Sequence, residues 1–254
     1  MRKILLSYHG LGDNILLTPV LRKYKELYPD ISLGMTRLRR LPVPALMEEC
    51  PYVDQWLEIS DPWNDYPTFE EGYEAILNDT KGYAVQFGYE EIIPLTMSPN
   101  LGITHKIYRA AKELGIEVDD FRTEIFPKIT EEIKEEADKF LAKVQEPYVF
   151  VHFKTGNPPK DISKAAAVQF LYGVSPFQII EYGTRTLPSN CLQLGNIPLE
   201  MEILSRCSKV ICADSFIMHA AGALGIPTVA VFVHTPPEWV MPLHDTPMEI
   251  YVRA

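Results

Sequence analysis

The segment Tyr8 to Pro19, YHGLGDNILLTP, joins two glycines and a carboxylate at the start of an expected helix. Glycine lets a ligand come close to backbone amides, so Gly10 and Gly12 fit a binding turn. A dinucleotide fingerprint would place a third glycine at position 15, where this chain has Ile15, so NAD or FAD binding is not indicated. Asp13 is then either a helix cap or a general base, although a helix start lowers the pKa of a carboxyl group.

A second segment, KVICADSFIMHAAGALGIPTVAVF, ends a buried strand at Asp214 and begins a helix at Ser215. The amides of Ser215, Phe216 and Ile217 would point out of the helix start and could bind an anion without a lysine. Asp214 could accept hydrogen bonds from sugar hydroxyls, and His219 could donate one to a phosphate or sugar oxygen. The alternative roles are a helix cap for Asp214 and a core histidine for His219.

The composition is that of a soluble globular protein with an excess of acidic residues. The 254 residues are 46% hydrophobic and 23% charged, and the net charge is -10. An acidic chain repels phosphate at long range, which argues against a general nucleic-acid binder. No apolar run approaches the ~20 residues that cross a bilayer, and the first one is too short for a signal peptide, so we expect an intracellular, cytoplasmic protein. The cysteines form no CxxC pair and are expected to be buried thiols, with neither a zinc site nor a disulfide framework: Cys50, Cys191, Cys207 and Cys212.

Apolar runs of strand length alternate with segments of helical period, which predicts an α/β fold with mostly parallel sheets. Strands are expected at residues 3–7, 31–38, 53–60, 83–88, 148–153, 177–183, 209–214 and 228–233. Helices are expected at residues 14–28, 104–115, 130–145, 163–172, 199–207 and 215–224. The alternation restarts between Pro127 and Pro147, which predicts two domains, residues 1–128 and 129–254. Open sheets of this kind bind ligands beyond the carboxyl ends of their strands, so a ligand between the halves would meet both segments described above.

Together the two segments resemble the heptosyltransferases of glycosyltransferase family 9. The resemblance lies in Gly-x-Gly-Asp-x-x-Leu-x-x-Pro from Gly10 to Pro19, and in Asp-Ser-x-x-Met-His-x-Ala-x-Ala-Leu-Gly-x-Pro-Thr-Val-x-x-Phe from Asp214 to Phe232. The resemblance implies a GT-B architecture of two facing Rossmann-like domains, with the acceptor on the first and the nucleotide sugar on the second. It also implies an inverting transfer from a nucleoside-diphosphate sugar, with ADP-linked heptose favoured, and no metal or other cofactor. The absence of an Asp-x-Asp pair fits a site without a divalent metal.

On the donor side, the resemblance implies a phosphate-binding lysine in the loop KTGNPPKDISK. Lys160 is favoured and Lys154 is the competitor, while Thr155 and Gly156 could offer a hydroxyl group and amides to the phosphates. A solvated loop lysine is the alternative for Lys160.

The resemblance implies further roles for residues that the spacing alone does not distinguish. Asp13 would take the proton from the acceptor hydroxyl, and the helix start at Ser215 and Phe216 would stabilise the leaving diphosphate. Glu181 would meet the ribose, and the base would lie against the backbone of residues 196–199, including Ile197.

On the acceptor side, TRLRRLP places Arg37, Arg39 and Arg40 after the second expected strand, at the end that should face the turn from His9 to Gly12. Guanidinium groups grip phosphates and carboxylates, so the cluster could hold an anionic glycan or glycolipid, such as a lipopolysaccharide-like core, with peripheral membrane contact. A solvated charge run is the alternative. Aromatic residues in and around the irregular segment 61–71 could stack on sugar faces or form local core.

Two positions depart from the family pattern. Phe216 stands where the family usually has a small residue, and Val233 stands where it tends to have glycine, so both narrow the space near the expected diphosphate. Two alternatives therefore stay open: a non-catalytic protein that binds sugar nucleotides or glycans, and a transferase that acts on a modified nucleobase or a protein.

Overall fold

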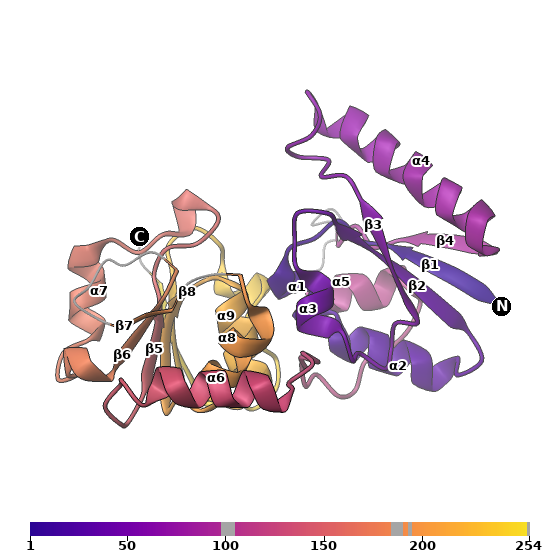
Figure 1. Cartoon of the computed structure of the whole chain (residues 1–254). Helices are drawn as coiled ribbons and strands as arrows, with labels where there is room; N and C mark the ends of the chain where they lie inside the picture. Colours follow the sequence, from indigo (N-terminus) through magenta and orange to yellow (C-terminus); the bar gives the residue numbers. More distant parts are fainter. Residues whose placement is uncertain (98–104, 184–189, 193–194, 253–254) are drawn as a thin grey trace.

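The chain folds into two α/β units that lie side by side, each built on one parallel sheet (Figure 1). The computed structural model describes residues 1–254 except 98–104, 184–189, 193–194 and 253–254. The alternation of strands and helices along the chain therefore predicted the fold class correctly. No helix in the described ranges is both long enough and apolar enough to cross a membrane.

The first unit is a sheet with the strand order β3-β2-β1-β4. Its strands are β1 (Arg2–Leu6), β2 (Ser32–Leu38), β3 (Gln55–Ile59) and β4 (Glu91–Pro94). Successive side chains of a strand point to opposite faces, so Leu5 and Leu6 enter different apolar clusters. Helix α4 (Phe69–Phe87) covers one face, and the other face carries α1 (Leu11–Leu16), α2 (Thr18–Leu27), α3 (Val43–Met47) and α5 (Lys106–Glu113) (Figure 1).

The second unit is a larger sheet with the strand order β10-β9-β8-β5-β6-β7. Its strands are β5 (Val149–His152), β6 (Ile179–Tyr182), β7 (Asn190–Leu192), β8 (Lys209–Ala213), β9 (Thr228–Phe232) and β10 (Met248–Val252). Its helices are α6 (Glu131–Leu141), α7 (Lys164–Phe170), α8 (Ile197–Ser205) and α9 (Phe216–Ala223), with 3₁₀ turns η2 (Pro158–Lys160), η3 (Pro176–Gln178) and η4 (Pro237–Trp239). Helix α6 packs on α8. The predicted domain boundary at residue 128 stays a prediction.

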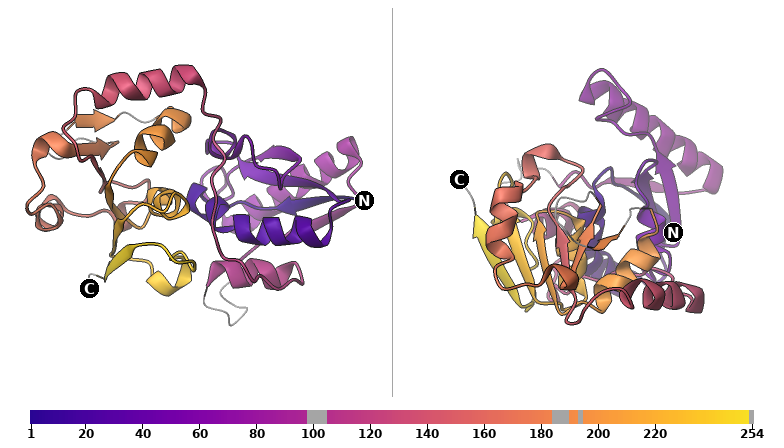
Figure 2. Two further views of the ribbon diagram at one scale, coloured as in Figure 1. Left: turned by 90° about the horizontal axis from the view of Figure 1, so that it is seen from below. Right: turned by 60° about the vertical axis from the view of Figure 1, so that its left-hand side comes forward.

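A single apolar cluster runs from the first unit into the second. It includes Leu16 on α1, Leu46 on α3, Ile203 on α8 and Met218 on α9, all of them buried. Helices α1 and α9, which follow β1 and β8, meet where the two units join (Figures 1 and 2). The contact of α1 with α9 therefore brings the loops at the carboxyl ends of β1 and β8 to one place.

The strand expected at residues 83–88 is wrong, because these residues belong to the end of α4. Thr68 caps this helix by accepting a hydrogen bond from the amide of Glu71 at 3.2 Å, and Gly88 ends it with φ 69°. The apolar spacing of this stretch marks no buried strand face, since Val85 is 86% exposed. The strand that pairs with β1 is β4, which follows the helix.

The structure differs from the sequence-based expectation in three further ways. The helix expected at residues 14–28 is two helices, α1 and α2, separated at Leu17, and Pro19 lies in the first turn of α2. Strands β7 and β10 lie at the two edges of the second sheet and were not expected from the sequence. The other expected strands and helices are present, with ends that shift by a few residues.

Candidate active site

The turn that carries Gly12 and the start of α9 are in direct contact. A Cβ atom built on Gly12 would lie 2.5 Å from Cδ2 of His219 and 3.3 Å from Cα of Phe216. Only a hydrogen atom fits there, so Gly12 permits the close approach of α1 and α9. The two segments singled out in the sequence therefore face each other, but at this point they touch, and the gap expected between them is closed.

Asp13 is not the cap of its helix. Gly10 occupies the N-cap position of α1, and Oδ1 of Asp13 accepts a hydrogen bond from Nζ of Lys106 at 2.5 Å. The Asp13 side chain is only 18% exposed. Burial opposes its ionisation, but Lys106, His9 and His219 together lower the pKa of Asp13 to about 2. The carboxylate is thus ionised at neutral pH, and the cap interpretation is wrong.

His219 is influenced by the carboxylates of both Asp13 and Asp214. The residue is 4% exposed, and Nδ1 has no hydrogen-bond partner in the described part of the chain. Burial lowers the pKa of His219, whereas Asp214 and Asp13 act in the opposite direction. The ring is therefore neutral at pH 7, and it is not a core histidine with both nitrogens satisfied.

Asp214 forms an ion pair with a lysine from the preceding loop. Nζ of Lys160, at the end of η2, lies 2.7 Å from Oδ2 of Asp214, whose side chain is 5% exposed. Ser215, and not Asp214, is the N-cap residue of α9. The Ser215 hydroxyl lies 2.9 Å from Nδ1 of His152 and makes no capping bond to the helix. The helix start thus keeps amides available for an anion.

The Phe216 ring lies over the carboxyl ends of β5 and β6. Its centroid is 6.0 Å from the ring of Tyr182 and 6.4 Å from that of His152, with edge-to-face orientations. Val233 packs against the apolar cluster that contains Val231. The bulky residue at position 216 therefore occupies space beside the amides of α9, while Val233 adds to the core of the sheet.

The two candidate lysines of the loop after β5 have different partners. Lys154 pairs with Asp161 at 3.2 Å and is 41% exposed, whereas Lys160 reaches α9. The amide of Thr155 donates to Asp161 at 2.7 Å, and its hydroxyl donates to the carbonyl of Asn157. Gly156 is exposed. Lys160 is thus the loop lysine that the structure places at the joint.

The residues expected around the nucleoside are largely buried. Glu181 lies within β6 rather than after it and is 1% exposed, and Ile197 is 5% exposed at the start of α8. The amides of Gly195 and Asn196 donate to Oε1 of Glu200 at 2.8 and 3.2 Å. Two backbone donors near the expected base position are therefore already bonded within the protein.

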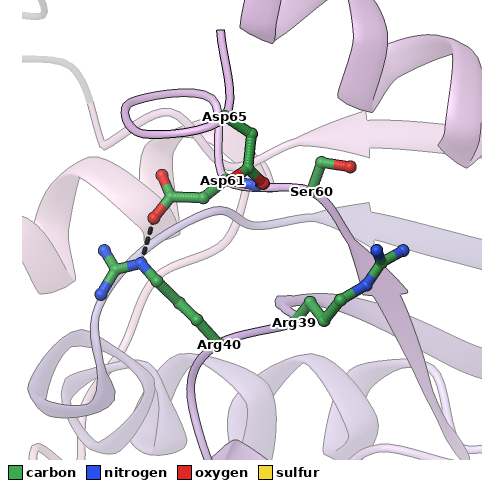
Figure 3. Close-up of a pocket in the computed structure, with 5 residues that line it drawn as sticks. All are labelled: Arg39, Arg40, Ser60, Asp61 and Asp65. Atoms are coloured by element: carbon green, nitrogen blue, oxygen red, sulfur yellow. Dashed lines mark hydrogen bonds and ion pairs between the residues drawn. The ribbon is translucent and has the colours of Figure 1, made fainter.

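The arginines expected on the acceptor side are each paired with a carboxylate. Glu58 of β3 accepts hydrogen bonds from Arg37 at 2.7 Å and from Arg39 at 2.9 Å, while Arg40 pairs with Asp61. Arg39 and Arg40 remain largely exposed in these pairs, so the alternative of a solvated charge run stays open. A hollow of about 580 Å³ lies at this place, and Figure 3 shows the residues that line it: Arg39, Arg40, Ser60, Asp61 and Asp65.

The acceptor-side turn before α1 is held from within the first unit. Nε2 of His9 donates to the carbonyl of Leu95 at 2.8 Å, and the side-chain amide of Asn14 donates to the carbonyl of Gly10 at 2.8 Å. Burial lowers the pKa of His9. His9 and Gly10 therefore fix the turn that presents Asp13.

Two charged residues near these groups were not predicted from the sequence, Lys106 and Glu200. Lys106 is an unremarkable residue of an amphipathic helix, and its contact with Asp13 arises only in three dimensions. Glu200 is fully buried in α8 and accepts a hydrogen bond from the Tyr182 hydroxyl at 2.5 Å. The local sign that Glu200 is buried is its place in the apolar segment IPLEMEIL.

Metal and thiol chemistry have little support in the described residues. Among them no group of three or more His, Cys, Asp or Glu side chains could hold a metal ion, and metal independence stays a prediction. Cys50, Cys207 and Cys212 are free and buried, as expected. Burial raises their pKa values, that of Cys50 to about 11, so these thiols are not reactive at neutral pH.

Comparison with protein families decides what this arrangement resembles. Residues 189–253, which contain β8, α9 and the ion-paired Asp214, match the model of glycosyltransferase family 9 (heptosyltransferase). The resemblance to family 9 is confirmed. A search of curated protein sequences gives no significant match.

Solved structures of family 9 and heptosyltransferase proteins share the fold of the whole chain. A family 9 glycosyl transferase from Veillonella parvula is 14% identical, covers 99% of this chain with 86% of its own length, and superposes with a TM-score of 0.72. The ADP-heptose lps heptosyltransferase II of E. coli is 15% identical over 98% of this chain and 90% of its own, with a TM-score of 0.65. The E. coli heptosyltransferase WaaC with ADP-2-deoxy-2-fluoro heptose is 13% identical over 98% and 92%, with a TM-score of 0.61. The two parallel sheets of this chain therefore have the GT-B fold of these glycosyltransferases.

Proposed function

We propose that this chain is a glycosyltransferase that moves a sugar, a heptose by similarity, from a nucleoside-diphosphate donor to a hydroxyl group of an acceptor. One observation carries the proposal. At the joint of the two units, the turn that carries an ionised carboxylate, Asp13, touches the start of α9, and Lys160 pairs with Asp214 directly before that helix. A base and a site for a leaving diphosphate are the two groups that such a transfer needs.

The donor would bind on the second unit. Lys160 and the amides at the start of α9 supply the positive charge that a diphosphate requires, without a metal ion. Asp214 uses one of the three N–H donors of Lys160, so a phosphate can bind the same ammonium group. An ADP-linked sugar is favoured, since a solved heptosyltransferase of this fold carries ADP-2-deoxy-2-fluoro heptose.

The chemical step follows from this placement. The acceptor oxygen forms a bond to the anomeric carbon while its proton passes to Asp13. The bond from that carbon to the diphosphate oxygen breaks, and its electron pair leaves with the diphosphate. Attack from the side of Asp13 on a donor held at α9 approaches the carbon from the face opposite the leaving group, which inverts its configuration.

The acceptor would bind on the first unit, at the hollow of Figure 3. Arg39 and Arg40 are paired but remain 70% and 54% exposed, so their guanidinium groups can still contact an anion. Trp63 is 60% exposed and stacks on Phe69 with a centroid distance of 4.2 Å, which leaves an aromatic face for a sugar ring. An anionic glycan or glycolipid fits these groups.

Sugar-nucleotide turnover by matched variants tests the proposal. The wild-type chain, D13N and D79N are incubated with ADP-, GDP-, UDP- and CDP-sugars, and release of the nucleoside diphosphate is measured. Asp79 is an exposed residue of α4, so D79N should behave as wild type, while D13N should lose at least ~100-fold in rate, as expected for loss of a general base. Equal rates in D13N and wild type would remove the assigned role of Asp13.

A second candidate, a binding protein without turnover, is favoured by the position of the Phe216 ring. This ring lies beside the helix start where the diphosphate should bind. If turnover is absent, thermal-shift measurement with the same nucleotide sugars separates the two candidates, because a ligand that binds only the folded state raises the midpoint. A shift without turnover would favour the binding protein, and F216A should then strengthen binding.

A further inference from the structure

Lys106 holds the carboxylate that is proposed as the base. Its Nζ atom donates to Oδ1 of Asp13 at 2.5 Å, and the two side chains are 24% and 18% exposed. The pair links α5 to α1 across 93 positions of the sequence. Little solvent reaches it, so the attraction is screened less than in a surface ion pair.

The start of α5, where Lys106 lies, is fixed by the second unit. His105 is the N-cap residue of α5, and its Nε2 donates to the carbonyl of Met241 at 2.8 Å. One turn further, the guanidinium group of Arg109 lies 5.3 Å from the ring centroid of Trp239. The position of Lys106 relative to Asp13 is therefore set by contacts between the units and not by a mobile loop.

The two oxygens of Asp13 differ in their surroundings. Oδ1 is occupied by Lys106, whereas no hydrogen bond within the described residues engages Oδ2. Oδ2 lies 3.9 Å from where a Cβ atom of Gly10 would be, above the glycine turn. Oδ2 is thus the oxygen that remains to accept a proton.

We propose that Lys106 is a positioning residue for the reaction: it keeps Asp13 ionised and leaves Oδ2 as the proton acceptor. The inference rests on the proposed function. When the acceptor oxygen bonds to the anomeric carbon, its proton moves to Oδ2, and the diphosphate leaves with the electron pair of the broken bond. The ammonium group beside the now neutral carboxyl then favours release of the proton to solvent, which restores the base.

Three titratable groups from different elements face Asp13. They are Lys106 on α5, His9 before α1 and His219 on α9. Lys106 is the one that bonds directly to the carboxylate. Removing it should therefore change the titration of Asp13 more than any change at the exposed surface of α5.

The test compares K106M and K106Q with K112M, which changes an exposed lysine on the same helix. Carboxyl ¹³C NMR follows the titration of Asp13, assigned by its disappearance in D13N. In K106M and K106Q the midpoint should rise by about one to three pH units, and it should stay in place in K112M. An unchanged midpoint in both Lys106 variants would overturn the proposal.

Turnover adds a second measurement. The acidic limb of the pH–rate profile should move upward in K106M and K106Q with little change in donor affinity, which a merely structural role would not produce. An active wild type with an unmoved profile in the Lys106 variants would overturn the positioning role. Absence of turnover in the wild type would remove the proposed function and the positioning role, while the NMR titration would still show whether Lys106 keeps Asp13 ionised.

Discussion

The ammonium group of Lys160 lies 2.7 Å from Oδ2 of Asp214, at the carboxyl end of β8, where water has little access to Asp214. An ammonium group has three N–H donors, so a phosphate can bind Lys160 while the ion pair with Asp214 stays in place. Asp214 can then accept a hydrogen bond from a further donor. A sugar hydroxyl is the donor that a nucleotide sugar brings.

The first prediction concerns the two lysines of the loop after β5. K160M should weaken donor binding by about 10- to 100-fold, the value of one charge-assisted hydrogen bond of about 1.5–3 kcal/mol. K154M should bind the donor nearly as well as wild type, since Lys154 pairs with Asp161 instead. Calorimetric titration with ADP and an ADP-sugar measures both. Equal losses in the two variants would contradict the assignment of Lys160.

The second prediction concerns the contact of α1 with α9. G12A should lower the free energy of unfolding by about 1–3 kcal/mol, because the added methyl group overlaps the His219 ring and crowds Phe216. Gly82 offers a matched control, since a Cβ atom there meets no atom within 4 Å. G82A should instead stabilise α4 by about 0.5–1 kcal/mol. Urea unfolding of both variants measures the difference, and a G12A variant as stable as wild type would show that the helices separate readily.

The third prediction concerns stability against pH. Burial lowers the pKa of His152 to about 4, and it also lowers the pKa values of His9, His105 and His219. Unfolded histidine titrates near pH 6.5, so between about pH 6.5 and 4 the unfolded chain binds protons that the folded chain does not. Stability is therefore complete above this range and falls with decreasing pH, by up to about 1.4 kcal/mol per pH unit for each histidine.

Urea unfolding between pH 7.5 and 5 measures this dependence. H152Q should reduce its slope by about the share of one histidine. A stability that is constant down to pH 5 would contradict the neutral state of the buried rings. The carboxylates with lowered pKa values, such as Asp13, act only at more acidic pH.

The fourth prediction is that EDTA leaves turnover intact. Lys160 and the amides of α9 are proposed to stabilise the leaving diphosphate. In metal-dependent transferases a divalent ion stabilises this charge. Turnover measured after chelation and again after addition of Mg²⁺ or Mn²⁺ checks the expectation. Strict dependence of turnover on either ion would contradict metal independence and show that the reaction needs a bound divalent ion.

Strands and helices were predicted correctly from the sequence where the pattern of apolar residues was strong. Continuous apolar runs such as Val229 to Phe232 have to be buried on both faces, and this identifies central parallel strands. The segment Tyr83 to Gly88 was wrongly predicted to be a strand, because its apolar residues also suit the last turns of a helix whose N-cap, Thr68, lies far upstream. Strand β10 has largely exposed side chains, so no apolar run marked it.

The candidate site was predictable only in part. Each motif follows a buried strand, which placed Asp13 and His219 at the ligand-binding edge of its own sheet, beyond the carboxyl ends of the strands. The pairing of Lys106 with Asp13, and of Arg37 with Glu58, depends on how separate elements pack, which no local spacing records. The contact of Gly12 with His219 depends in the same way on the approach of the two units.

The apolar cluster shared by α1, α3, α8 and α9 has a consequence for how a substrate enters. Parting the two units as lobes about a hinge would expose side chains such as Leu16 and Met218 to water, at a cost that grows with the apolar area uncovered. The chain should thus unfold as one cooperative body, and a sugar nucleotide should gain entry by displacing side chains at the rim of the joint.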